Sequence, residues 1–196
     1  MSSDPIKPHH LLWLQAAVQA SHRSPRVDNK NGAVIVDTRG TILSTDHNIP
    51  RFKDNFERRA LYAAHPTWQK NAPCAEARAI LAAQQKGLDL THGTLVTLWH
   101  PCASVCLGPI QRAGIRTIIH LVCDKGTPLM PDVWPDLSAR TRQDIRKGWK
   151  QSKKLVHRGT LTIMPIPVSS VAHLLSLPTH GGGHTHTAGC AHSSRL

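Results

Sequence analysis

The sequence is poor in aromatic residues and has no long apolar run, and both shortages exclude classes of protein. Aromatic side chains make up 4% of the 196 residues, so few rings are available for stacking the bases of single-stranded nucleic acid. No apolar stretch approaches the ~20 residues that cross a bilayer. The opening "MSSDPIKPHH" also lacks the charged and apolar regions of a secretion signal. We therefore expect a cytoplasmic protein with no membrane partner.

Cysteine is scarce and unevenly placed. The five cysteines are an odd number, and a reducing compartment disfavours a disulfide framework. Three of them lie in two short motifs, each opened by proline: Cys74 in "PCAEARAI", and Cys102 and Cys106 in "HPCASVC". Metal binding or catalysis explains this spacing better than cross-linking does.

Acidic residues are half as frequent as basic ones, with 12 Asp and Glu against 24 Lys and Arg, a formal charge of +12. Such a surface favours phosphate-bearing partners. The charge alone is equally consistent with binding of nucleotides, with binding of polynucleotides and with a basic surface that is only solvated. The segment "RKGWKQSKKLVHR", residues 146–158, is a candidate nucleic-acid face. We favour the interpretation that it is the solvated side of a helix.

The apolar pattern predicts strands alternating with helices. The expected elements are a helix over 9–24, a hairpin over 32–45, a helix over 74–86, a strand over 94–99, a helix over 102–113, a strand over 117–123, a helix within 135–155 and a strand over 161–167. This order indicates a three-layer α/β/α sheet with parallel crossovers after the hairpin. Helices that follow strands begin at one edge of such a sheet, so Cys74 and Cys102 should face each other there.

Two further stretches have a composition that differs from the rest. Residues 47–73 are irregular and polar, and loops of this length in a compact domain are usually functional. Residues 179–196 are rich in Gly, His and Ser, so we expect a disordered tail after one domain over residues 1–178. His180, His184, His186 and His192 with Cys190 make the tail a candidate second metal site, although flexible His-rich tails often bind none.

Three thiols and a carboxylate in these motifs suit a catalytic zinc. A thiolate at a helix N-terminus is stabilised by the helix dipole, and three protein ligands leave the fourth tetrahedral position for water. Glu76 would reach that water without being a ligand and move its protons. The alternatives are that each cysteine is a small apolar core residue, that Glu76 only balances the helix dipole, or that the zinc is structural and the module inactive.

The pattern Cys74-Ala75-Glu76 with Pro101-Cys102 and Cys106 resembles the zinc-dependent cytidine and deoxycytidylate deaminases. The stretches "NGAVIVDTRGTILSTDHNIPR" and "QRAGIRTIIH" are similar to deoxycytidylate deaminases, and the likeness covers roughly residues 10–170. It implies a cytidine-deaminase-like α/β/α fold with a five-stranded mixed sheet. It also implies zinc held by the three cysteines, with a zinc-bound hydroxide that attacks C4 of cytosine.

The resemblance also implies a substrate site. Asn48 matches an asparagine that lies beside the nucleoside, and the basic residues Arg26, Lys30 and Arg51 are candidates for a 5′-phosphate. By this reading the enzyme converts dCMP to dUMP. dCTP and dTTP become candidate effectors and a homo-oligomer the expected assembly. Without the family, Asn48 is equally well explained as a turn residue.

The sequence departs from the family pattern at the metal and near the substrate. The second motif is Cys-x3-Cys instead of Cys-x2-Cys, which a tightened or bulged turn can absorb, with His100 as the spare ligand. Three thiolates make a bound water less acidic than two thiolates and an imidazole, and Arg78 is a candidate compensating cation. The second candidate substrate is therefore a cytosine or adenine base in RNA or single-stranded DNA, with Trp99 as a stacking platform, although a free nucleotide fits the resemblance better.

Overall fold

The protein forms one five-stranded mixed sheet in a computed structural model that describes residues 6–26, 30–49, 74–123 and 139–175. The strand order is β2-β1-β3-β4-β5. Strand β1 pairs antiparallel with β2 and β3, whereas β3, β4 and β5 run parallel. The predicted mixed sheet is confirmed. The strands are β1 Gly32–Val36, β2 Ile42–His47, β3 Thr94–Thr97, β4 Thr117–Val122 and β5 Thr162–Pro167.

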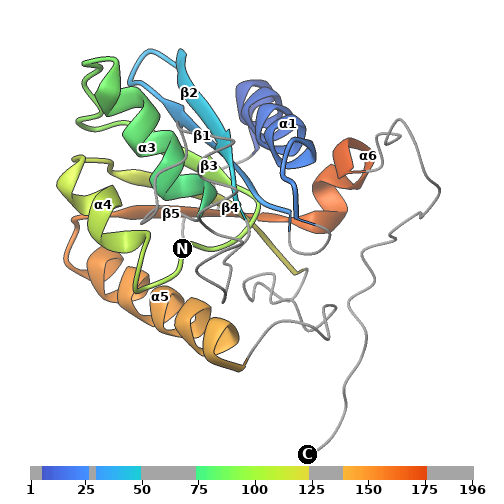
Figure 1. Ribbon diagram of the computed structural model, residues 1–196. Helices are drawn as coiled ribbons and strands as arrows, with labels where there is room; N and C mark the ends of the chain where they lie inside the picture. The colour runs from blue at the N-terminus through green and yellow to red at the C-terminus, as the bar shows by residue number, and fades with distance from the viewer. Residues whose placement is uncertain (1–5, 27–29, 50–73, 124–138, 176–196) are drawn as a thin grey trace, which may run out of the picture.

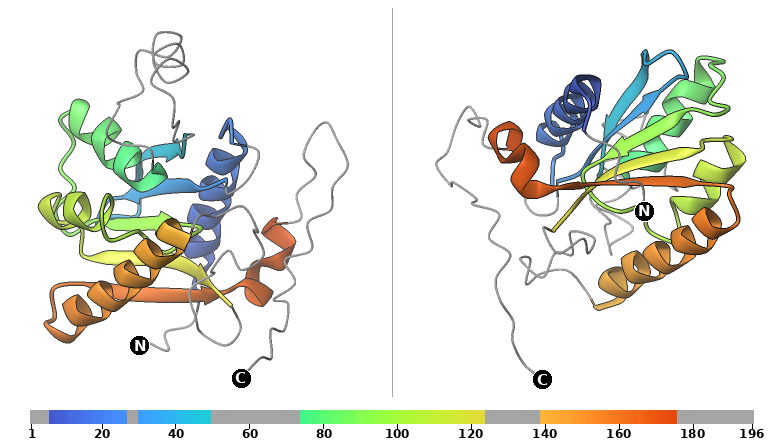
Figure 2. Two further views of the ribbon diagram at one scale, coloured as in Figure 1. Left: turned by 60° about the horizontal axis from the view of Figure 1, so that its bottom comes forward. Right: turned by 180° about the vertical axis from the view of Figure 1, so that it is seen from behind.

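Helices cover both faces of the sheet (Figure 1). On one face lie α1 and the short C-terminal turns, and on the other lie α3, α4 and α5, as the second set of views also shows (Figure 2). The predicted three layers are therefore present. The bounds are α1 Pro8–His22, α3 Ala75–Gln85, α4 Leu107–Arg112, α5 Ala139–His157, the 3-10 turn η2 Val168–Val171 and α6 Ala172–Leu175.

Alternation along the strands separates two apolar cores. In β1, Ala33 and Ile35 join the core under α3 and α4, while Val34 and Val36 join the core under α1. Neighbouring side chains of a strand point to opposite faces, so a continuous apolar run is what a sheet covered on both sides requires. The five residues of β1 are all buried, which explains why the run "GAVIV" shows no polar alternation.

The helix predicted over 102–113 begins later than expected. It starts at Leu107, and residues 103–106 form turns instead. The backbone N–H groups of Cys106 and Leu107 both donate to the carbonyl of Cys102, each at 3.3 Å. Pro109 lacks an N–H, which suits the first turn of a helix. Cys102 therefore lies before the helix and does not open it.

The predicted ends of two helices are confirmed. Gly87 and Gly114 follow α3 and α4 with φ of +68° and +73°, the left-handed conformation that glycine adopts without the steric cost of a Cβ atom. No helix among the described residues is long and apolar enough to span a membrane. Most of the long loop over 47–73 and the tail over 179–196 lie outside the described residues, so the expectations for both stay predictions.

Close packing of α1 on β1 depends on the absence of a side chain at Gly32. A Cβ atom there would lie 1.9 Å from the Ala17 carbonyl oxygen and 2.7 Å from the Ser21 nitrogen, both backbone atoms. We expect Gly32→Ala to lower the free energy of unfolding by about 3 kcal/mol, because backbone cannot yield as a side chain does. Urea unfolding followed by circular dichroism measures the loss.

The matched control for this substitution is Gln19→Ala on the exposed side of α1, which should change the free energy of unfolding by less than about 0.5 kcal/mol. Similar losses in the two variants would show that Gly32 is not a point of close contact.

Candidate metal centre and its buried carboxylate

Three thiols from two distant chain segments meet at one edge of the sheet. Cys74 is the residue before α3, and Cys102 and Cys106 flank the turn that leads into α4. The sulfur of Cys102 lies 3.9 Å from that of Cys74 and 3.3 Å from that of Cys106, and all three lie within 4.8 Å of one another. The expected meeting of the two motifs is therefore present in the structure.

The sulfur separations fit a zinc ion. Tetrahedral thiolates at ~2.3 Å from zinc stand about 3.8 Å apart, close to the distances between these sulfurs. Cys102 and Cys106 are buried and Cys74 is half-buried. Sulfur ligands at this spacing suit zinc better than the hard cations, which prefer oxygen. Cys74, Cys102 and Cys106 would hold the ion and leave one position of its tetrahedron for another ligand.

The thiols do not ionise independently. Hydrogen bonds from the Cys106 and Cys74 thiols lower the pKa of Cys102 to about 2. The same hydrogen bonds raise the pKa of Cys74 and Cys106, because these two act as the donors. Without a cation these hydrogen bonds favour ionisation of Cys102 and oppose ionisation of Cys74 and Cys106. Metal binding would have to displace the protons of these two thiols.

The extra residue of the Cys-x3-Cys motif is absorbed in the turn before α4. Because Cys106 reaches the other two sulfurs, the spare ligand His100 is not needed. Its Nδ1 lies 3.3 Å from Nε2 of His120 and its Nε2 lies 3.0 Å from the Ser152 hydroxyl. Burial lowers the pKa of His100 to about 3 and of His120 to about 4. Both rings are therefore neutral and pack behind residues 101–106, the turn before α4 that is called the cysteine turn below.

Glu76 lies on the first turn of α3 with its carboxylate buried beside the thiols. Its Oε1 accepts hydrogen bonds from Asn31 Nδ2 at 3.1 Å and from the Thr97 hydroxyl at 3.2 Å. Its other oxygen, Oε2, lies 3.6 Å from the sulfur of Cys106. Burial, and then the charge of Cys102, raise the pKa of Glu76 to about 7. One oxygen is thus fixed by the protein and the other faces the sulfur cluster.

Asn31 and Thr97 are not among the site residues predicted from the sequence. Asn31 directly precedes β1, and Thr97 ends β3 opposite Ala33 in the β1–β3 register. Both are buried. A buried polar residue needs a partner. The signal available in the sequence was the threonine at the end of the strand "TLVT". The partner, Glu76, lies on a different element and is not visible from the local pattern.

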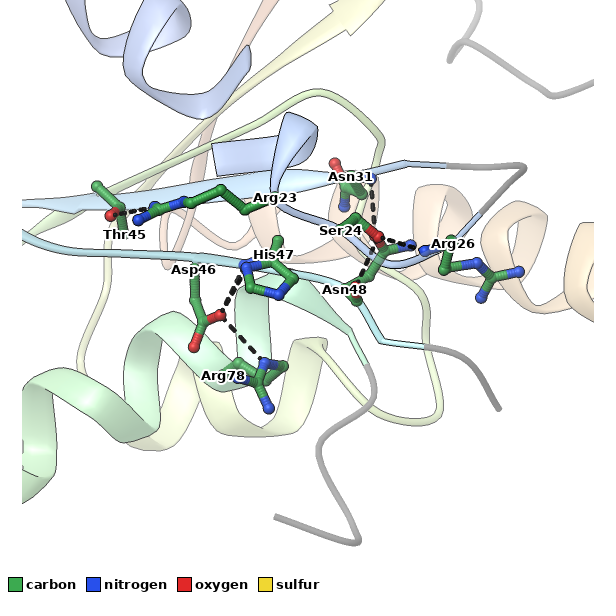
Figure 3. A network of polar contacts seen from close by, with 9 residues as sticks. All are labelled: Arg23, Ser24, Arg26, Asn31, Thr45, Asp46, His47, Asn48 and Arg78. Atoms are coloured by element: carbon green, nitrogen blue, oxygen red, sulfur yellow. Dashed lines mark hydrogen bonds and ion pairs between the residues drawn. The ribbon is translucent and has the colours of Figure 1, made fainter. Parts of the chain in front are cut away.

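Asn48 belongs to the same polar network (Figure 3). Its Oδ1 accepts a hydrogen bond from the Asn31 backbone N–H at 2.8 Å and from the Ser24 hydroxyl at 2.9 Å. The Asn48 N–H in turn donates to the Asn31 carbonyl at 3.0 Å. Asn48 thus fixes the backbone of the residue that holds Glu76. Its contact with a substrate stays a prediction.

The three basic residues proposed for a phosphate have different outcomes. The backbone N–H of Arg26 donates to the Ser24 hydroxyl at 3.3 Å, but its guanidinium points away from Asn31 and Asn48 (Figure 3). The carbonyl of Lys30 accepts a hydrogen bond from the Trp99 indole at 3.0 Å, which anchors that ring. Arg51 lies outside the described residues. A phosphate contact by any of them stays a prediction.

Arg78 carries a charge that is already balanced. Its Nε donates to Oδ1 of Asp46 at 3.1 Å, and the same oxygen lies 3.4 Å from Nδ1 of His47 (Figure 3). Burial lowers the pKa of His47, so this ring is neutral near pH 7. The guanidinium of Arg78 therefore has a carboxylate partner of its own, which weakens the idea that it offsets three thiolates.

One stripe of α5 packs on the cysteine turn. The Asp144 carboxylate accepts hydrogen bonds from the backbone N–H and the hydroxyl of Ser104, and its carbonyl accepts one from Ala103 at 3.3 Å. One turn later, a Cβ atom at Gly148 would lie 2.3 Å from the Pro101 carbonyl oxygen. Ser152, a further turn along, contacts His100. Residues four apart share a helix face, so α5 positions the turn that carries Cys102.

We expect the cysteine cluster to bind a single zinc ion per chain, and Cys106→Ser to abolish tight binding because a neutral hydroxyl replaces a thiolate ligand. Zinc content measured by elemental analysis after dialysis against a mild chelator tests this. Cys123→Ser changes a half-buried cysteine outside the cluster and should leave zinc content unchanged. Equal zinc retention in both variants would contradict the assignment.

Gly148→Ala should weaken the metal site from outside it. Helix propensity alone predicts a gain in stability of about 1 kcal/mol, whereas the contact with Pro101 predicts a displaced turn. We expect zinc affinity to fall roughly 10- to 100-fold, measured by chelator competition, together with a shift in the thiolate-to-metal absorption of the Co²⁺ form. Gln151→Ala, exposed on the same helix, is the control. A more stable variant with unchanged metal affinity would refute the role of Gly148.

Comparisons with known proteins agree with this geometry. Several solved structures share the fold, and three of them, each less than 25% identical, serve as examples. A diaminohydroxyphosphoribosylaminopyrimidine deaminase/5-amino-6-(5-phosphoribosylamino)uracil reductase from Thermotoga maritima has a TM-score of 0.54 at 18% identity, over 85% of this chain and 39% of that chain. RibD from Acinetobacter baumannii has 0.50 at 16%, over 86% and 38%. A dCMP deaminase from cyanophage S-TIM5 has 0.50 at 16%, over 82% and 100%.

The chain thus spans about two fifths of the first two proteins and the whole length of the third. No curated protein matches the sequence significantly. The family described as "Cytidine and deoxycytidylate deaminase zinc-binding region" matches residues 7–122, a range that contains all three thiols, Glu76 and its two hydrogen-bond partners. The chain belongs to the cytidine and deoxycytidylate deaminase family and carries its zinc-binding region.

Proposed function

We propose that the protein hydrolyses the 4-amino group of cytosine in dCMP, giving dUMP and ammonia. One observation supports the deaminase chemistry above all others: Glu76 is buried beside the three thiols, with one carboxylate oxygen held by Asn31 and Thr97 and the other 3.6 Å from the sulfur of Cys106. A structural zinc site has no use for a carboxylate arranged in this way.

The reaction adds water to C4 and removes the amino group. Zinc, when bound, supplies a Lewis acid that makes water a better nucleophile near neutral pH. Glu76 Oε2 accepts the proton of the attacking water and passes it to N3 of the base as the C4–O bond forms. A second proton, carried from the new hydroxyl to the amino nitrogen, lets the C4–N bond break. Water and cytosine are consumed, and uracil and ammonia leave.

The choice of substrate follows from the family. The matching family is named for cytidine and deoxycytidylate. One of the solved structures that share the fold is a dCMP deaminase. Asn48, whose amide can both donate and accept, lies beside Asn31 in the same network. Regulation by dCTP and dTTP and a homo-oligomeric assembly are further parts of this proposal.

We expect Glu76→Gln to reduce ammonia release from dCMP roughly 10²- to 10⁴-fold, the usual contribution of a general acid-base group, while zinc content stays the same. The amide keeps the shape of the side chain and removes its ability to accept a proton. A coupled assay for ammonia with the zinc-loaded protein measures the effect. Gln85→Ala at the end of the same helix is the control and should retain full activity.

The substrate panel contains dCMP, cytidine, their 5-substituted forms and a cytosine-containing single strand. If the protein released ammonia from the single strand and from none of the free nucleosides or nucleotides, the second candidate substrate, a base in a polynucleotide, would be the correct one. If the zinc-loaded protein released no ammonia from any of these, or if Glu76→Gln behaved like the unaltered protein, the proposed deamination would be wrong.

A further inference from the structure

Helix α5 has two faces with different chemistry. Its inner face is apolar or small, and Ile145, Gly148 and Ser152 are buried there against the sheet and the cysteine turn. Trp149, half-buried, packs edge-on against the rings of His100 and His120. The helix runs along the outside of the layer that covers this face of the sheet (Figure 2). The packing of the inner face against the sheet and the cysteine turn therefore fixes the position of the outer face.

The outer face is lined by cations. The 19 residues of α5 contain seven Lys or Arg and a single Asp, a net charge of +6 and thus half of the +12 of the whole chain. The basic side chains within its described part and just after it share one sector of the helix and are all exposed. They are Arg146, Lys147, Lys150, Lys153, Lys154, His157 and Arg158.

No acidic side chain balances this sector in the described part of α5. Asp144, its one acid, is turned to the cysteine turn and bonded to Ser104. Lys150 and Lys154 are spaced four apart, as are Arg146 and Lys150, and like charges at this spacing destabilise a helix. Exposed faces of soluble helices usually interleave both signs. The repulsion along α5 would be relieved by a partner that carries closely spaced negative charges.

We propose that the cationic face of α5 binds the phosphate backbone of nucleic acid. Phosphates along a strand present a regular row of negative charge, and Lys and Arg neutralise it without reading the base sequence. Arg146, Lys150 and Lys154 recur about once per helical turn over ~12 Å, so one side of a backbone can follow them. Since α5 is anchored through Gly148 and Ser152, its backbone is already ordered, and only the basic side chains lose freedom on binding.

The same face fits other anionic partners less well. A helix that lies on a membrane turns its apolar side to the lipid, but the apolar side of α5 is buried in the core. Protein interfaces are usually centred on buried aromatic or apolar anchors. Along the described part of the outer face, Val156 is the one exposed large apolar side chain, at 37%. Trp149 also has partners already, since its ring contacts two histidines and the Lys153 ammonium at 4.8 Å. The outer face therefore offers a partner positive charge, but neither a ring for stacking nor an apolar area to bury.

The test uses Lys150→Glu with Lys154→Glu against a control of equal charge change, Arg39→Glu with Lys86→Glu, whose residues are exposed on the β1–β2 turn and after α3. Binding of a short fluorescein-labelled RNA duplex to the full chain is followed by anisotropy between about 50 and 200 mM salt. We expect the α5 variant to bind at least tenfold more weakly, with the slope of log affinity against log salt reduced by about 2. The control should keep the slope.

Equal losses in the two variants would show that only net charge matters and would overturn the proposal, as would a lack of binding by the unaltered protein at physiological salt. Binding of an acidic polypeptide or of anionic vesicles in preference to RNA would overturn it as well. Ammonia release from dCMP separates this proposal from the proposed function. The α5 variant should retain it, since its two lysines lie on the face turned away from the cysteine turn.

Discussion

The contact on which the structure depends is the meeting of two turns, one before α3 and one before α4, at a common edge of the sheet. The turn before α4 follows β3, which pairs parallel with β4. Strand β2 is antiparallel to β1 and therefore runs in the same direction as β3, so β2 and β3 end at the same edge, where α3 begins. Three sulfurs then lie within 4.8 Å of one another. A divalent cation would stabilise three thiolates at these separations.

The Glu76 carboxylate beside the sulfurs is positioned by residues at the ends of β1 and β3. Asn31 and Thr97 come from neighbouring strands, and each donates to the same oxygen of Glu76. Asn48 fixes the backbone of Asn31, so three residues at the ends of β1, β2 and β3 hold one proton-carrying group. This explains why a buried carboxylate, whose burial is costly, is retained. Its pKa is raised by burial, which suits a group that must both accept and release a proton near neutral pH.

Helix α5 links the metal turn to the surface. Its inner stripe contacts the segment from His100 to Ser104 through a carboxylate, a glycine and a serine at successive turns. The helix as a whole carries half of the net charge of the chain, and the basic side chains in its described part lie on the outer face. A single helix thus has a role in shaping the site and offers a surface for phosphates, and the two roles use different residues.

The sequence by itself determined the order of the elements, the buried strands, the cysteines and Glu76, because these follow from local periodicity and from residue chemistry at fixed spacing. Only the tertiary structure decided which partners Glu76 has, since Asn31 and Thr97 are 45 and 21 residues away from it in the chain. It also moved the start of α4 from Cys102 to Leu107, where turn hydrogen bonds absorb the additional residue. Pairing across long separations depends on how strands and helices pack, and no local pattern records it.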